Sequence, residues 1–224
     1  MKLLALDTAS ELCSAALWID GACQTRECER ARGSGELILG MIEQLLAESA
    51  LSLKGLDAIA FGCGPGAFTG VRLALAVAQG LALAVGLPLL PISDLRALAL
   101  RAISTTGAPA RALICQDARM AEVYWGCFER SGETVPPAPE AVSAPGAVHL
   151  PRHWSASPVC GAGSGFEAYE ALSSRLQLAP VWGRLRPRAL EVARLAALDG
   201  LATAVPPDAA EPVYLRNDVA TPQS

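Results

Sequence analysis

Residues 62–86 read GCGPGAFTGVRLALAVAQGLALAVG, a glycine-rich turn followed by a long run of small apolar residues. The apolar segment LDAIAFG (56–62) before it predicts a strand, and the pattern after Ala67 predicts a helix over about 68–85. The turn lacks both the spacing and the lysine of GxxxxGK[ST], and it departs from GxGxxG. The stretch therefore favours a helix built for packing over a phosphate-binding loop, although an anion at the helix N-terminus stays open.

Strands and helices alternate on both sides of this stretch, which indicates an α/β fold. An antiparallel meander is predicted at the N-terminus, with the hairpin dipeptide Asp20-Gly21 between its second and third strands. The expected elements of the first half are strands at 3–6, 15–19, 22–29, 56–62 and 88–93 and helices at 36–49, 68–85 and 94–103.

The opening pattern recurs in the second half of the chain. Asp7 ends an apolar strand before a hairpin return, and Asp117 does the same within 112–132. We therefore expect a duplicated fold with two lobes, residues 1–103 and a smaller or degenerate lobe of residues 104–224, and we leave open whether the tail returns to the first lobe. The remaining expectations are a proline-rich loop at 134–158, a strand and glycine turn at 158–166, helices near 166–177 and 188–199, and a last element at 212–216.

Composition excludes several classes of protein. Of 224 residues, 52% are hydrophobic and 18% charged, which argues against disorder. The net charge of −4 argues against a free-standing nucleic-acid binder. Seven scattered cysteines without a CxxC pair indicate reduced thiols in a cytoplasmic protein. Residues 73–92 carry no charge, but glycines and prolines interrupt them. They predict a buried helix and strand, and no membrane span is expected.

Two helices have more apolar surface than one lobe needs. On helix 36–49 the apolar residues fan over roughly 200°, whereas burial on one side needs about 100°; they are Leu37, Ile38, Leu39, Met41, Ile42, Leu45 and Leu46. Helix 68–85 has a small-residue stripe, formed by Gly66, Gly70, Ala74, Ala78 and Ala82. This stripe fits packing inside the lobe and packing against a partner equally well. A second face, with Arg72, Ala76, Gln79 and Leu83, favours a partner, because polar groups are rarely buried alone.

Few residues suggest chemistry. Asp7 and Asp117 could serve phosphate transfer, but capping of their own turns is the favoured interpretation. His149 and His153 form an HxxxH that Pro151 interrupts, so we expect two exposed loop histidines and no metal site. Gly161 and Gly163 are weak candidates for approaching a nucleotide, and a plain turn is favoured.

Four blocks resemble the signature of the bacterial TsaB family, also called YeaZ. They are LALDTAS (4–10), GCGPGAFTGVRLALAVAQGLAL (62–83), QDARMAEVYW (116–125) and EPVYLRNDVA (211–220), and they occur in the family's order. The GPGAFTGVR portion is highly specific, and the resemblance covers essentially the whole chain.

This resemblance implies a duplicated actin-like (ASKHA, ribonuclease H-like) fold without a cofactor. It implies a non-catalytic accessory subunit in making threonylcarbamoyladenosine at position 37 of tRNAs that read codons beginning with A. The catalytic subunit would be the paralogue TsaD, which contacts the tRNA, and the ATPase TsaE would join a larger assembly. Alone, the chain would form a homodimer, and a peptidase activity is not supported.

The resemblance also assigns partner docking to helices 36–49 and 68–85. The expected interface residues are Leu37, Met41, Leu45, Phe68, Arg72, Ala76, Gln79 and Leu83. The alternative from another class is a small actin-like ATPase or kinase that uses Asp7 and Asp117. A purely structural homodimer is a third interpretation.

Overall fold

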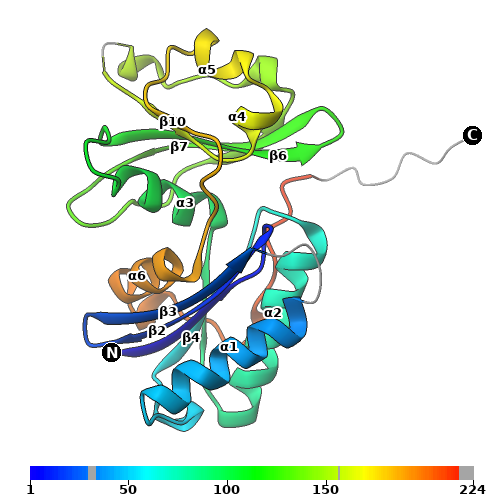
Figure 1. Ribbon diagram of the computed structural model, residues 1–224, viewed down its shortest axis with the longest axis vertical. Helices are drawn as coiled ribbons and strands as arrows, with labels where there is room; N and C mark the ends of the chain where they lie inside the picture. The colour runs from blue at the N-terminus through cyan, green and yellow to red at the C-terminus, as the bar shows by residue number, and fades with distance from the viewer. Residues whose placement is uncertain (30–33, 156, 217–224) are drawn as a thin grey trace, which may run out of the picture.

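Two lobes, each built on a five-stranded mixed sheet, make up the chain (Figure 1). The computed structural model describes residues 1–29, 34–155 and 157–216. The strand order is β3-β2-β1-β4-β5 in the first sheet and β8-β7-β6-β9-β10 in the second. In both sheets the first three strands are antiparallel and the last two are parallel additions. The shared topology confirms the duplicated α/β organisation.

The elements of the first lobe follow the sequence pattern closely. They are β1 (Lys2–Asp7), β2 (Leu12–Ile19), β3 (Ala22–Glu29), α1 (Ser34–Glu48), β4 (Ala58–Gly62), α2 (Phe68–Val85) and β5 (Leu89–Ile92). The next helix, α3 (Asp94–Ile103), packs on β6, β7 and β9 of the second sheet. The hairpin between β2 and β3 turns at Asp20 and Gly21, both with positive φ, as predicted. Helix α2 ends at Gly86, whose φ of 74° is the left-handed conformation that favours glycine.

The second lobe departs from expectation in three places. Its elements are β6 (Arg111–Arg119), β7 (Glu122–Glu129), β8 (Glu140–Ser143), β9 (Cys160–Ala162), α4 (Gly165–Ala168), α5 (Ala171–Arg175) and β10 (Val181–Trp182). The helix that follows, α6 (Ala189–Asp199), packs on the first sheet. The segment expected as a loop contains β8, because its proline-free residues EAVS pair with β7 at the sheet edge. The helix expected over 166–177 is broken at Tyr169, whose non-helical backbone accompanies packing of its ring on the outer core. Residues 212–216 join neither sheet.

Helices and sheets stack in five layers (Figure 1). Helices α1 and α2 cover the outer face of the first sheet, and α4 and α5 cover that of the second. Between the sheets lie α3 and α6, whose side chains share one core with both sheets. Because α6 packs on β1 and β2, and Val205 pairs with Leu89 of β5, the chain after residue 188 returns to the first lobe.

The glycine turn packs against the bend that follows β1. A Cβ at Gly70 would overlap the carbonyl oxygen of Thr8, and one at Gly66 would lie 2.6 Å from that of Ala9. Two hydrogen bonds close the contact: Ala67 N–H donates to Ala9 O (2.7 Å), and Thr8 Oγ1 donates to Gly70 O (2.6 Å). The glycines therefore let the start of α2 approach its own sheet.

The small-residue stripe continues along the inner face of α2. Its alanines, Ala74, Ala78 and Ala82, are fully buried in the core beneath α1 and α2. This settles the alternative that the sequence left open, since the stripe packs inside the lobe. Within the described residues, α2 is the one helix long and apolar enough to cross a membrane. Its inner face covers the first sheet, which leaves the outer face exposed.

Two glycine substitutions in α2 test this packing. We expect Gly70→Ala to destabilise the protein by about 1–3 kcal/mol or more, because the new methyl group meets backbone rather than a flexible side chain. Gly80→Ala is the matched control: no atom lies within 4 Å of its Cβ position, so the better helix former should stabilise by about 0.5–1 kcal/mol. Urea unfolding of both variants measures the difference, and equal effects would contradict the proposed contact.

Candidate functional site

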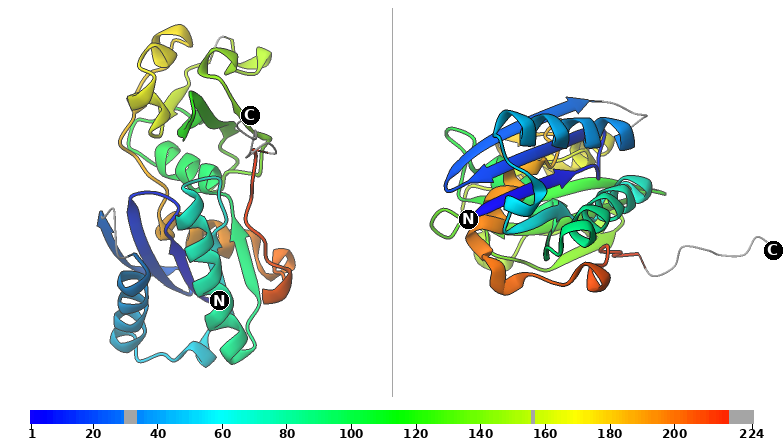
Figure 2. Two further views of the ribbon diagram at one scale, coloured as in Figure 1. Left: turned by 90° about the vertical axis from the view of Figure 1, so that its right-hand side faces the viewer. Right: turned by 90° about the horizontal axis from the view of Figure 1, so that it is seen from below.

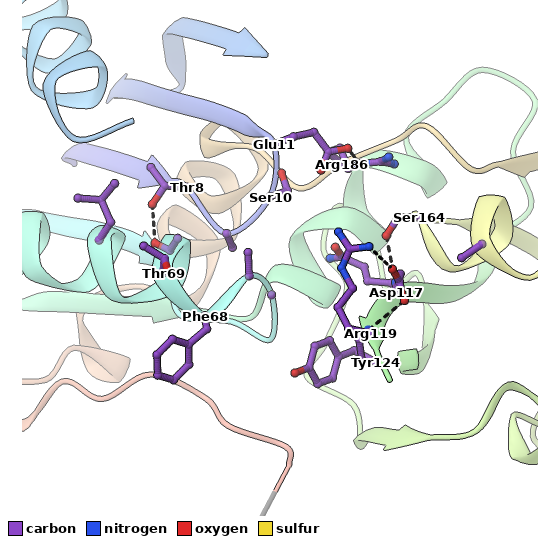
Figure 3. Close-up of a pocket in the computed structure, with 18 of the residues that line it drawn as sticks. Thr8, Ser10, Glu11, Phe68, Thr69, Asp117, Arg119, Tyr124, Ser164 and Arg186 are labelled. Carbon is purple, nitrogen blue, oxygen red and sulfur yellow. Dashed lines mark hydrogen bonds and ion pairs between the residues drawn. The ribbon is translucent and has the colours of Figure 1, made fainter. Parts of the chain in front are cut away.

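A cleft of about 1370 Å³ separates the lobes at the ends of β1 and β6 (Figure 3). The first lobe contributes Thr8, Ser10, Glu11 and the first turn of α2. From the second lobe come Gln116, Asp117, Arg119, Ser164 and Arg186, among others. Polar side chains of both lobes therefore face each other across this cleft.

Asp117 is held by its own turn. Its carboxylate accepts the Arg119 N–H at 2.9 Å and lies 3.1 Å from the Arg119 guanidinium, and its own N–H donates to Ser164 Oγ at 3.0 Å (Figure 3). This is the capping arrangement that the sequence favours.

Asp7 does not reach the cleft at all. It is fully buried, its carboxylate accepts the Ala9 N–H at 2.7 Å, and its other oxygen faces Asp94. Asp94, also fully buried at the start of α3, accepts the Gly64 N–H. The two carboxyl groups meet beside Gly62, where any Cβ would overlap Asp94. A shared proton is the arrangement that removes the repulsion of two enclosed carboxylates.

Electrostatics agrees with a protonated pair. Burial raises the pKa of Asp7 to about 6. Burial and the neighbouring Asp7 raise the pKa of Asp94 well above its ordinary value. Glu191 of α6 and Glu140 of β8 add to these shifts from nearby elements. The glycine turn therefore rests on an acid pair that holds a proton.

The other suggested residues serve packing or face solvent. A Cβ at Gly163 would overlap the Cys115 carbonyl, and one at Gly161 would lie 2.9 Å from the Phe166 ring, so both glycines fit the turn against their own lobe. Neither lines the cleft. His149 and His153 are exposed in the loop after β8, as expected. In the described part of the chain, no three His, Cys, Asp or Glu side chains cluster as a metal site requires.

The outer face of α2 is apolar and open. Leu83 is 65% and Phe68 55% exposed, with Ala76 exposed between them, and Arg72 is the only charged residue of the helix. Gln79 is half-buried, because its amide donates to Pro207 O (2.8 Å) and Ala210 O (3.3 Å) of the C-terminal segment.

Helix α1 exposes fewer apolar side chains to a partner than the sequence suggests. Met41 (7% exposed) and Leu45 (0%) point into the core of their own lobe, so they are not available to a partner as expected. Leu37 is half-buried against the same core. The apolar arc is wide because it wraps over the sheet and toward α2. Among the large apolar side chains of α1, only Leu39 is exposed to solvent, and it lies between exposed Glu36 and Glu43.

Four residues escaped the sequence analysis. Asp94 follows the N-cap residue Ser93, and an acidic residue in the first turn of a helix is common, so the sequence does not mark it as unusual. Arg186 bridges the lobes by pairing with Glu11 and Glu167. Tyr214 and Arg216 lie in a segment without periodicity, and residues 217–220 of its resembling block fall outside the described residues.

Comparison with known proteins identifies relatives over nearly the whole length of the chain. The family model of TsaD, described as tRNA N6-adenosine threonylcarbamoyltransferase, matches residues 29–170. The tRNA threonylcarbamoyladenosine biosynthesis protein TsaB of Escherichia coli K12 is 39% identical over 98% of this chain and 96% of its own. Its namesake from Haemophilus influenzae is 48% identical over 56% of this chain and 52% of its own.

Comparison with solved structures points to the same family. YeaZ from Pseudomonas aeruginosa superposes with a TM-score of 0.88 at 40% identity, covering 96% of this chain and 99% of its own. A second structure from that organism, described as an uncharacterized protein with similarity to peptidase YEAZ, gives the same values.

The acid pair predicts a pH dependence of stability. Raised pKa values mean that the folded state holds a proton that free aspartates lose above about pH 4. The stabilisation is therefore complete below that pH and is lost as the pH rises through the folded values. We expect the free energy of unfolding to fall as the pH rises above about 4.5, by at most about 1.4 kcal/mol per pH unit for one proton. Asp94→Asn should flatten this slope, whereas exposed Asp208→Asn should keep it; parallel slopes in both variants would contradict the shared proton.

Proposed function

The chain belongs to the TsaB (YeaZ) family, and on that premise we propose that it is a non-catalytic accessory subunit in the biosynthesis of threonylcarbamoyladenosine in tRNA. It has the two-lobed α/β fold of the YeaZ structures, and the proposal takes this fold to be actin-like (ASKHA, ribonuclease H-like). In this proposal the chain binds TsaD through the outer face of α2 and stabilises it in an active conformation. The tRNA contacts TsaD, TsaE joins the assembly, and the location is cytoplasmic.

The exposed face of α2 carries this proposal. A surface helix of a soluble protein normally places charged residues on its outer side. On α2 the outer side carries Phe68, Ala76 and Leu83, and its single charged residue is an arginine. Burying each large side chain in an interface contributes about 1.5–3 kcal/mol, so a partner that covers the face gains a substantial apolar contact.

The family match supports TsaD as the partner. The TsaD family model covers both α1 and α2, so a TsaD partner has an equivalent pair of helices to offer. Two such pairs packed together form a four-helix bundle. In this bundle α2 lies at the centre, and α1 adds Leu39 and an acidic rim with Glu36 and Glu43. Without TsaD, the same face would pair with a second copy.

The described residues offer little support for catalysis by this chain. Asp7 is enclosed beneath the glycine turn, where a magnesium ion or substrate cannot reach it. Burial raises the pKa of the Cys115 and Cys127 thiols to about 12, so neither is a thiolate nucleophile at neutral pH. The two histidines lie outside the cleft. These features favour an accessory role over a kinase or a peptidase.

Calorimetry separates the accessory subunit from the actin-like kinase. We expect the isolated chain to show no binding of ATP with magnesium at micromolar concentrations, because Asp7 shares its proton with Asp94 and Asp117 is engaged by its turn. Tight binding that Asp117→Asn abolishes would favour the kinase instead.

Leu83→Glu tests the docking face. Leu83 is exposed, so the variant should fold normally, yet a charge in the interface should weaken TsaD binding by about 2 kcal/mol or more, roughly thirtyfold in Kd. Met41→Asp is unsuitable for this purpose, because it would place a charge in the core.

The matched control is Leu198→Glu on α6, where the leucine is 47% exposed on another surface. It should bind TsaD normally. Titration calorimetry gives the affinities, and reconstituted tRNA modification should fall with Leu83→Glu and without the chain. If Leu83→Glu binds TsaD with wild-type affinity, α2 is not part of the interface. If tRNA is fully modified without the chain, the chain is not an accessory subunit.

A further inference from the structure

The C-terminal segment, residues 207–216, runs from the first lobe to the second along the side of α2 (Figures 1 and 2). It belongs to neither sheet, and residues on both lobes bind it. We call residues 207–216 the strap.

Hydrogen bonds fix the strap to the first lobe. The Gln79 amide donates to two strap carbonyls, those of Pro207 and Ala210. Val213 N–H donates to Cys63 O at 2.7 Å, which places the strap against the glycine turn itself. The strap therefore follows α2 toward its N-terminus.

An aromatic cluster follows at that end of the helix. Arg72 Nε donates to the Tyr214 hydroxyl at 2.8 Å, and its guanidinium lies 3.8 Å from the centre of the Phe68 ring. The Phe68 and Tyr214 rings are 6.0 Å apart. Phe68 and Arg72 also belong to the outer face of α2, so the strap borders the face proposed to bind TsaD.

Two residues later the strap reaches the other lobe. The Arg216 guanidinium donates to Ala118 O (3.2 Å), pairs with the Glu122 carboxylate and lies 3.3 Å from Met120 Sδ. These residues form the hairpin turn between β6 and β7. In that turn Arg119, Met120 and Ala121 all have positive φ, a conformation costly for non-glycine residues. The Arg216 contacts therefore support a strained turn.

We infer that the strap is a latch that couples the outer face of α2 to the β6–β7 turn of the opposite lobe. Tyr214 and Arg216 both line the interlobe cleft, so movement of the strap changes the opening of the cleft. A partner that packs on Phe68 or Arg72 meets Tyr214, and only Leu215 separates Tyr214 from Arg216. The coupling to a partner rests on the proposed function, whereas the latch itself does not.

Arg216→Ala tests the latch in the isolated protein. We expect backbone amides of residues 118–123 to exchange with solvent at least tenfold faster, and chymotrypsin to cut faster after Tyr214. Arg152→Ala, an exposed arginine of the same lobe, is the control and should change neither. Glu122→Gln weakens the same ion pair from the other side and should reproduce the effect if Arg216→Ala folds poorly. Unchanged exchange in both variants would overturn the latch.

The coupling is tested by adding TsaD to the wild type and to Arg216→Ala. Binding should alter exchange at residues 118–123 in the wild type by at least threefold and leave it unaltered in the variant. Binding without any change in the wild-type turn would overturn the coupling. Absence of binding by the wild type would instead overturn the proposed function and leave the latch result standing.

Discussion

The close approach of α2 to the bend after β1 is the contact on which the rest of the molecule depends. It requires residues without side chains at Gly66 and Gly70, because backbone atoms of Thr8 and Ala9 occupy the space that a Cβ would take. This approach directs Ala74, Ala78 and Ala82 into the core. The opposite side of the same helix, with Phe68, Ala76 and Leu83, is thereby turned outward.

The enclosed acid pair keeps the carboxyl group of Asp7 away from the interlobe cleft. A carboxylate at the end of β1 could serve phosphate transfer only if it reached the cleft. Here Asp7 instead turns inward, and Asp94 meets it where Gly62 leaves room. Buried polar groups are retained when their partners are satisfied, and one proton satisfies both acids. Several charged side chains that line the cleft pair with one another, such as Asp117 with Arg119 and Arg186 with Glu11.

Sequence patterns predict the first lobe well and its surface less well. Helix α2 begins and ends where the pattern places it, because a glycine turn and Gly86 mark its two ends. Met41 and Leu45 were misplaced because periodicity gives the width of an apolar arc but not what covers it. Strand β8 is a four-residue edge element among prolines and has no distinctive pattern. Tyr214 and Arg216 contact residues far away in the chain, and local patterns in a single sequence do not predict such contacts.

The position of α6 in the chain has a consequence for synthesis on the ribosome. This helix covers the inner face of the first sheet, yet it is encoded almost a hundred residues after the last strand of that sheet. At translation speeds of ~5–20 residues per second, the sheet waits on the order of ten seconds for its cover. During that interval the nascent chain exposes aliphatic surface to solvent, and holdase chaperones are suited to shield it.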